Sequence, residues 1–179
     1  VYQRQLLKGI EDGFQGNDSI LNAEEMANVQ KEFGEKMKAL QEERLQTLKA
    51  KNKKAGADFL EQNRKKEGVV VTSSGLQYQL VKKGKGPKPK ADDRVKVDYV
   101  GTLINGTEFD NSIKRGKSVV FGVDQVIAGW GEALQLMEVG SKYRLVIPSE
   151  LAYGEKGAPP MIEPNSVLIF DVNLLAIEE

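Results

Sequence analysis

The stretch RVKVDYVGTL, residues 94–103, decides the class of fold. Every second position holds an apolar residue or glycine: Val95, Val97, Tyr99, Gly101 and Leu103. Their neighbours are mostly polar. Because successive side chains of a β-strand point to opposite faces of a sheet, this period of two predicts a strand with one buried face. An antiparallel sheet with one solvated face is the usual setting for such a strand.

Shorter runs of β-branched and aromatic residues flank that strand and predict further strands. They lie at residues 69–71, 76–80, 119–121, 142–147 and 167–177. A single short helix is expected from Trp130 to Met137, ended near Val139-Gly140. Residues 69–179 are therefore expected to form an α+β domain, an antiparallel sheet with one helix packed on it.

The first 66 residues have the period of helices instead. Leu6, Leu7, Ile10 and Phe14 predict a short amphipathic helix, which residues 16–19 interrupt. Asn22 followed by Glu25 has the pattern of a capping box and predicts the start of a second helix. No strong breaker follows before Lys66, so about 44 residues at 1.5 Å each would form a rod of roughly 66 Å.

The long helix carries an apolar stripe only in its first part. The stripe comprises Met26, Val29, Phe33, Met37 and Leu40, with a loose continuation at Leu45 and Leu48. Residues 49–54 are polar all round, which predicts a solvent-exposed spacer. The apolar faces are too few for a monomeric domain, so we expect a homodimer through the N-terminal helices, the alternative being that they fold back on the C-terminal domain.

These patterns divide the chain into three regions. Residues 1–48 form the expected helical dimerisation region, residues 49–68 continue the long linker helix, and residues 69–179 form the α+β domain. The first residue is Val1, not Met, so a processed chain or a fragment is expected.

Composition excludes several classes of chemistry. The 26 basic and 26 acidic residues give a net charge of zero, which argues against a nucleic-acid partner. The chain has no cysteine and no histidine, so thiol nucleophiles, disulfides, serine–histidine triads and His- or Cys-based zinc sites are excluded. No calcium loop and no apolar run long enough to span a membrane occurs, and neither a metal nor a cofactor is expected.

Individual candidate residues have ordinary structural explanations when each is taken alone. Trp130, the only tryptophan, is a ligand-facing or a packed core residue, and Asp110 fits a turn or a helix cap, with Arg115 as a partner. Tyr153 lies in a Gly/Pro-rich loop, where its hydroxyl could bind a ligand carbonyl or simply face solvent. The apolar loop 158–164 either lines a binding site or covers its own core.

The order of the motifs is more specific than any one of them. Five segments in sequence resemble the FKBP family of macrolide-binding prolyl isomerases: VDYVGTL (97–103), NGTEFDNS (105–112), VIAGWGEAL (126–134), VGSK followed by IPSELAYG (139–154), and PNSVLIFDVNLL (164–175). The resemblance covers residues 69–179. It implies a twisted antiparallel sheet wrapped around one short helix, with the pocket between them.

The resemblance also implies the residues of the pocket. Those matching the family's catalytic positions are Tyr99, Phe109, Asp110, Trp130, Tyr153 and Phe170, and those matching its substrate-binding positions are Arg115, Phe121, Val126, Ile127 and Ile162. Trp130 would form the floor under the prolyl ring. The backbone N–H of Ile127 and the hydroxyl of Tyr153 would bind ligand carbonyls. Neither a cofactor nor a metal is implied.

The N-terminal part looks like the helical arm of Mip-like and FkpA-like bacterial members, joined to the catalytic domain through residues 74–78. This implies a homodimer acting on unfolded or partly folded proline-containing polypeptides, exported to the periplasm or cell envelope, although similar cytoplasmic dimers exist. Departures from the common pattern at Val119, Gln125, residues 158–160 and Glu163 leave macrolide affinity and the preference for the residue before proline open.

Two other functions fit parts of the sequence. A holdase chaperone or binding module with little catalysis would use the N-terminal apolar faces to bind clients. A coiled-coil scaffold with a passenger domain fits the long helix but leaves the pocket motifs unexplained.

Overall fold

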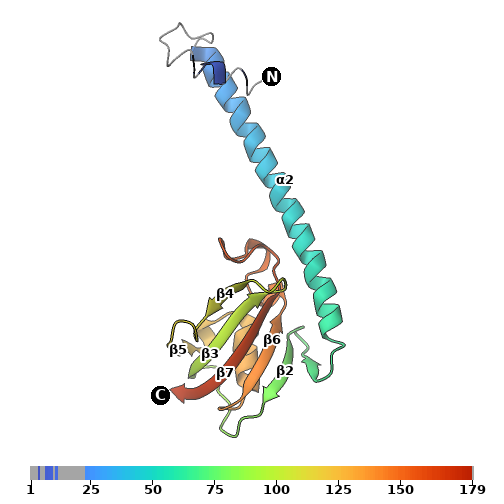
Figure 1. Cartoon of the computed structure of the whole chain (residues 1–179), viewed down its shortest axis with the longest axis vertical. Helices are drawn as coiled ribbons and strands as arrows, with labels where there is room; N and C mark the ends of the chain where they lie inside the picture. Colours follow the sequence, from blue (N-terminus) through green and yellow to red (C-terminus); the bar gives the residue numbers. More distant parts are fainter. Residues whose placement is uncertain (1–3, 5–6, 10, 12–22, 179) are drawn as a thin grey trace. The chain divides into compact units, whose positions relative to one another are not determined.

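A computed structural model describes residues 4, 7–9, 11 and 23–178. The chain divides into two compact units, Val1–Gln46 and Thr47–Glu179. Helix α2, Ala23–Asn63, begins in the first unit and ends in the second, which confirms the long helix (Figure 1). Arg4, residues 7–9 and Glu11 are helical, whereas Leu6, Ile10, Phe14, the break at 16–19 and the cap at Asn22 lie outside the described residues.

The second unit contains an antiparallel sheet, as the alternating pattern predicts. Its strands are β1 (Val69–Val71), β2 (Gln77–Lys82), β3 (Arg94–Leu103), β4 (Glu108–Asn111), β5 (Val119–Gly122), β6 (Lys142–Ile147) and β7 (Leu168–Glu178). Their spatial order is β1-β2-β6-β7-β3-β4, and β5 also pairs with β3. The expected α+β class, a twisted antiparallel sheet around one short helix, is confirmed.

Strand β3 organises the sheet. It pairs along its whole length with β7, from Arg94 opposite Glu178 to Leu103 opposite Leu168. On its other side, the first half pairs with β5 and the second half with β4. Its burial alternates as the sequence predicts, with Val95, Val97, Tyr99 and Gly101 facing the interior.

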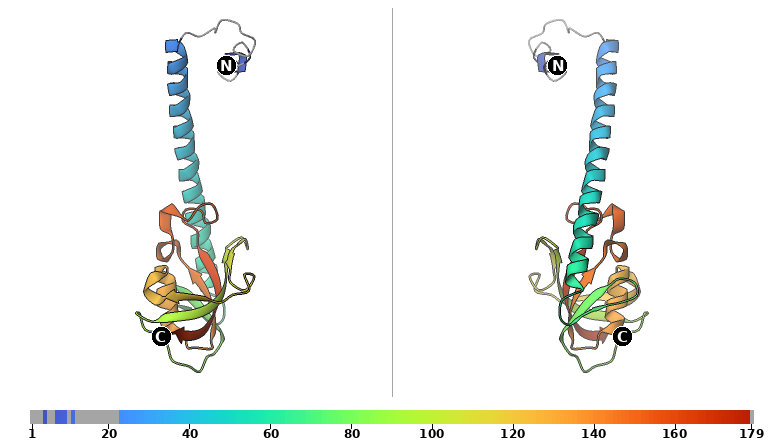
Figure 2. Two further views of the ribbon diagram at one scale, coloured as in Figure 1. Left: turned by 90° about the vertical axis from the view of Figure 1, so that its left-hand side faces the viewer. Right: turned by 90° about the vertical axis from the view of Figure 1, so that its right-hand side faces the viewer.

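The main core lies between the sheet and helix α3, Ala128–Leu136 (Figure 2). Ala133 and Leu134 of that helix are buried against residues such as Leu145 and Leu168 of the sheet. A second, smaller core lies on the opposite sheet face, because Val146 and Ile169 alternate with neighbours that face α3. Phe59 and Leu60 of α2 cover this second core.

The expectation that residues 49–54 form a solvent-exposed spacer holds for only part of the segment. Ala50, Lys51, Lys53 and Lys54 are exposed, whereas Lys49 and Asn52 are partly buried. One face of the helix packs on the sheet unit even though its residues are polar. The Lys49 carbonyl accepts a hydrogen bond from Asn165 Nδ2 (3.2 Å), and Asn52 Nδ2 donates to the Pro164 carbonyl (3.0 Å). Further along, Asn63 and Gln77 form a buried side-chain hydrogen bond of 2.9 Å. A stripe of amides and a glycine carries the contact, so hydrophobic periodicity does not reveal it.

Three elements differ from the expectations. Helix α2 ends at Asn63, so residues 64–68 do not continue the linker helix. Residues 108–111 form strand β4, whereas the sequence favours a turn or cap at Asp110. The strand is only four residues long and polar except for Phe109, so pairing with β3 decides its conformation and intrinsic propensity does not. Helix α3 begins at Ala128, two residues before the expected start, and ends at Leu136.

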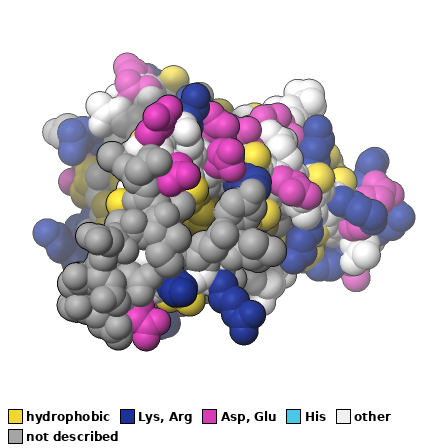
Figure 3. All heavy atoms as spheres, turned by 90° about the horizontal axis from the view of Figure 1, so that it is seen from above, with side chains coloured by type: hydrophobic (Ala, Val, Ile, Leu, Met, Phe, Trp, Pro, Cys, Tyr) yellow, Lys and Arg dark blue, Asp and Glu magenta, His cyan; other side chains and the backbone are white. Residues whose placement is uncertain are grey.

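The described surface carries charges of both signs. Acidic and basic side chains are interspersed in the view of Figure 3, in keeping with a net charge of zero. Over the described residues, no helix combines the length and the apolar character that a membrane crossing requires.

Candidate active site

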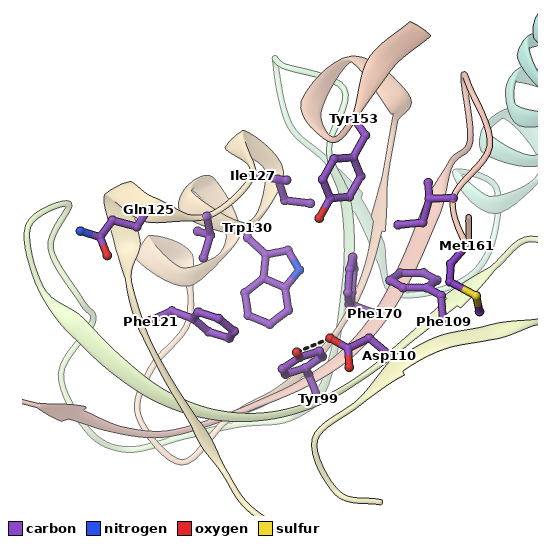
Figure 4. A pocket seen from close by; sticks show the side chains of 12 residues that line it. Tyr99, Phe109, Asp110, Phe121, Gln125, Ile127, Trp130, Tyr153, Met161 and Phe170 are labelled. Atoms are coloured by element: carbon purple, nitrogen blue, oxygen red, sulfur yellow. Dashed lines mark hydrogen bonds between the residues drawn. The ribbon is translucent and has the colours of Figure 1, made fainter. Parts of the chain in front are cut away.

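A cavity of about 640 Å³ opens between helix α3, the sheet and the loop that follows β6 (Figure 4). Aromatic and aliphatic side chains form most of its wall, with a few polar groups. The lining residues are Tyr99, Phe109, Asp110, Phe121, Gln125, Val126, Ile127, Trp130, Tyr153, Met161, Ile162 and Phe170. Apolar pockets of this size with few polar groups are typical binding sites for small ligands and peptide side chains.

Trp130 forms the floor of the cavity. Its indole is only 4% exposed and meets three rings edge to face. The ring centroids of Tyr99 and Phe170 lie 5.2 Å away, at 86° and 87° to the indole plane, and that of Phe121 lies 5.8 Å away. Edge-to-face contacts favour these orientations, so the indole face is held toward the opening.

Gly101 allows two of these rings to meet. It lies opposite Phe170 on β7 and opposite Asp110 on β4. A Cβ atom at this position would lie 2.8 Å from the rings of both Phe109 and Phe170, closer than real contacts allow. The missing side chain therefore makes room for the Phe109–Phe170 pair, whose centroids are 5.4 Å apart at 89°.

The main polar group in the wall is a three-residue network. The Tyr99 hydroxyl donates to Asp110 Oδ2, as the dashed line in Figure 4 marks, and Arg115 Nη1 donates to Asp110 Oδ1. Arg115 Nη2 also donates to the Tyr99 hydroxyl (3.0 Å). The Asn111 backbone N–H donates to Asp110 as well (2.8 Å), so this half-buried carboxylate is fixed from several directions.

This network determines the charge state of its members. Burial alone would raise the pKa of Asp110, but hydrogen bonds from Tyr99 and Arg115 and the guanidinium charge outweigh it, so the pKa lies below its ordinary value. Burial, with the hydrogen bond to Asp110, raises the pKa of Tyr99. Asp110 is therefore an anion and Tyr99 a neutral donor at neutral pH.

One side of the cavity is formed by residues 153–165, which we call the rim loop. Its Tyr153, Met161 and Ile162 side chains line the cavity, and the Tyr153 hydroxyl points inward (Figure 4). Ile127, beside Tyr153 in Figure 4, is the residue before α3, and within the described part of the chain its backbone N–H donates no backbone hydrogen bond. Two possible donors thus lie next to each other at the cavity.

The structure brings the candidate residues together, with one exception. Ten of the candidates line the cavity: Tyr99, Phe109, Asp110, Phe121, Val126, Ile127, Trp130, Tyr153, Ile162 and Phe170. Arg115 does not, and it reaches the site only through Asp110 and Tyr99. Gln125 and Met161 line the cavity but were not among the candidates. Each had a signal in the sequence, since Gln125 is one of the departures from the family pattern and Met161 lies in the apolar loop 158–164.

Two family models match the chain. One is described as FKBP-type peptidyl-prolyl cis-trans isomerase and matches residues 86–175. The other is described as a domain amino terminal to FKBP-type peptidyl-prolyl isomerase and matches residues 1–80. Together they span the helical arm and the sheet with its cavity.

Curated relatives extend the similarity over nearly the whole chain. FKBP-type peptidyl-prolyl cis-trans isomerase FkpA of Aeromonas hydrophila is 49% identical over 97% of this chain, which spans 64% of that relative's length. An FKBP-type 22 kDa peptidyl-prolyl cis-trans isomerase of Escherichia coli is 45% identical over 96% of this chain and 82% of its own length. Outer membrane protein MIP of Legionella longbeachae is 42% identical, covering 97% and 75%.

A solved structure shows the same fold. The crystal structure of FkpA from Escherichia coli superposes with a TM-score of 0.89 at 43% sequence identity, covering 98% of this chain and 82% of that chain.

Proposed function

The chain belongs to the family of FKBP-type peptidyl-prolyl cis-trans isomerases, and on that premise we propose that it accelerates the cis/trans isomerisation of X–Pro bonds in unfolded and partly folded proteins. The observation that carries the proposal is the open cavity floored by the Trp130 indole. Uncatalysed isomerisation takes tens to hundreds of seconds and can limit folding, so such an activity has a clear use.

The chemistry requires neither a nucleophile nor a cofactor. Rotation about the peptide bond costs about 18–20 kcal/mol, because the twisted amide loses its resonance. The planar amide has more charge separation than the twisted one, so an apolar cavity disfavours the planar form more strongly. A site that binds the twisted form better lowers the barrier, and each 1.36 kcal/mol of preference gives about a tenfold rate.

The roles of the lining residues follow from their places in the cavity. Trp130 would support the prolyl ring, with Tyr99 and Phe170 as walls. The Ile127 N–H and the Tyr153 hydroxyl, which belong to neighbouring residues of the cavity, would bind carbonyls of the substrate. Asp110, held by Arg115, would act electrostatically, not as an acid or base, because its pKa is lowered.

A peptide isomerisation assay tests this proposal. Trp130→Ala removes the floor, so kcat/KM on a proline tetrapeptide is expected to fall by about a hundredfold or more, as the loss of a buried aromatic contact allows. Trp130→Phe, which keeps an aromatic floor, should retain most of the activity. Equal activity of the parent and Trp130→Ala, both folded by circular dichroism, would reject a catalytic cavity.

The N-terminal helix supports a proposed homodimer. Helix α2 exposes five large apolar side chains by 40–55% in the single chain: Met26, Phe33, Met37, Leu40 and Leu45. The buried residues of the main core, in comparison, are at most 6% exposed. Packing these faces against a second copy would remove them from water. Two cavities on one dimer would raise the affinity for large clients by avidity. We place the dimer in the bacterial cell envelope, since one relative is named an outer membrane protein.

The exposed apolar residues of α2 also favour a second candidate function, that of a holdase chaperone. If the chain is a holdase, the parent and its Trp130→Ala variant should suppress the aggregation of a proline-free client equally well. An isomerase alone would not act on that client. The two functions can occur in one chain, and this pair of assays separates their contributions.

A further inference from the structure

The rim loop is held together by backbone hydrogen bonds between its own residues. The Asn165 backbone N–H donates to the Gly154 carbonyl (2.8 Å), which joins the two ends of the loop. Ala158 and Ile162 exchange two backbone hydrogen bonds of 2.8 and 3.0 Å in the middle of the loop. The loop is thus a compact unit whose orientation depends on what it rests against.

Helix α2 provides that support. Asn52 Nδ2 donates both to Glu163 Oε2 and to the Pro164 carbonyl, each at 3.0 Å. Asn165 Nδ2 returns a hydrogen bond to the Lys49 carbonyl at 3.2 Å. In Figure 4 the rim-loop segment that carries Met161 lies between the cavity and this helix.

The contacts differ in strength. Lys49 Nζ also pairs with Glu155 Oε2 at 3.2 Å, but the Glu155 side chain is 75% exposed, and such a pair contributes little. The bond from Asn52 to the Pro164 carbonyl is partly buried, and Asn165 is 9% exposed. Gly56 permits the close approach, since a Cβ there would lie 2.8 Å from Val167 Cγ2.

We propose that Asn52 and Asn165 are positioning residues for the cavity: by tying the rim loop to helix α2, they set where Tyr153, Met161 and Ile162 stand over the floor. The inference rests on the proposed isomerase function. Its consequence is that residues 47–63 of the helix belong functionally to the active site. Neither asparagine is among the residues that line the cavity.

Asn52→Ala tests the proposal in the full chain. The substitution removes both hydrogen bonds to the rim loop while improving helix propensity, so a weaker helix cannot explain a loss. Lys53→Ala is the matched control, because Lys53 is exposed and adjacent residues of a helix do not share a face. The rim loop should bind planar and twisted substrate alike, so KM for a proline tetrapeptide should rise about two- to tenfold with kcat little changed.

Amide hydrogen exchange provides a readout independent of activity. The amides of Ala158, Ile162 and Asn165 should exchange about tenfold faster in Asn52→Ala, while those of β3 and β7 stay as in the parent. Asn165→Gly should act in the same direction. Asn165 has a φ of 58°, which glycine adopts without strain, so only the side-chain bond to Lys49 is lost.

A pair of substitutions, one that adds a charge and one that removes the opposing charge, gives the most specific test. Asn52→Asp places a carboxylate against Glu163 and the Pro164 carbonyl, so it should raise KM more than alanine does. Adding Glu163→Gln restores a donor between the two side chains and should recover part of the loss.

The outcomes are distinguishable. Unchanged rim-loop exchange in both Asn52→Ala and Asn165→Gly, or faster exchange with an unchanged KM, would overturn the proposal. If the parent itself does not isomerise peptides, the proposed function fails, and the exchange data alone then decide whether the two asparagines hold the loop.

Discussion

At the scale of single residues, the charge of Asp110 is the feature that most needs a test. The carboxylate is fixed by Tyr99 and Arg115 beside an apolar cavity. Asp110→Leu should lower kcat/KM by about ten- to a hundredfold, the worth of a charged hydrogen bond, without abolishing activity. Asp110→Asn keeps one carbonyl oxygen that can accept from Arg115, and its amide nitrogen can donate to the Tyr99 hydroxyl, so it should lose less. A complete loss of activity in folded Asp110→Leu would contradict a purely electrostatic role.

The same residues predict the pH dependence. The Asp110 carboxyl has a lower pKa in the folded chain than the ordinary 3.8. It therefore stabilises the fold at pH values above its unfolded-state pKa, and this contribution is lost as the pH falls through the folded-state pKa. Tyr99, with a raised pKa, stabilises the fold below 10.0, and that contribution is lost as pH rises further. Without histidine, kcat/KM should be constant from about pH 5 to 9. A bell-shaped profile centred near neutrality would indicate acid–base catalysis instead.

At the scale of elements, helix α2 offers a matched pair of glycines. A Cβ at Gly34 would meet nothing within 4 Å, so Gly34→Ala should stabilise the helix by about 0.5–1 kcal/mol. At Gly56 the new methyl would meet the stiff Val167 side chain, and a steric cost of about 1–3 kcal/mol exceeds that gain.

Two spectroscopic signals can measure the stability of the Gly34→Ala and Gly56→Ala variants. Helical circular dichroism should report a higher unfolding midpoint for Gly34→Ala. Trp130 fluorescence, which belongs to the sheet unit, should report a lower midpoint for Gly56→Ala. Stabilisation by both substitutions would mean that α2 does not pack on the sheet at Gly56.

The elements also show what the sequence could and could not predict. The alternation from Val95 to Leu103 predicts β3 because its buried face is apolar. Strand β4 carries no such pattern, since partner strand β3 imposes its conformation. The docked face of α2 escapes prediction because Lys49, Asn52 and Gly56 contact the sheet unit through polar atoms and a missing side chain. The residues around the cavity are foreseen by resemblance to a family, not by pattern.

At the scale of the whole molecule, the docked segment changes where the chain should be divided. Removing residues 1–66 would strip Phe59 and Leu60 from the second core and Asn52 from the rim loop. A chain of residues 47–179, the second compact unit, keeps these contacts. We expect this shorter chain to isomerise short peptides like the parent, whereas removal up to residue 66 should raise KM. Equal peptide kinetics for the two truncations would show that the helix segment does not matter to the cavity.

The proposed dimer makes a prediction that leaves the cavity untouched. Phe33 is 55% exposed on α2 and shares its helical face with Met26 and Met37. Phe33→Glu would place a charge in the dimer interface, which is expected to shift the mass measured by light scattering from dimer to monomer. Asn28→Glu, on an exposed position of the opposite face of the same helix, is the control for added charge.

Activity then separates the two levels of function. In the monomer produced by Phe33→Glu, kcat/KM on a tetrapeptide should match the parent, because each cavity is complete within one chain. Catalysis of the proline-limited refolding of a protein should fall several-fold or more, because a second cavity no longer holds the client by avidity. If peptide and protein substrates lost activity in equal measure, the dimer would be supporting the cavity itself, and the separation of binding arm from catalytic unit would have to be abandoned.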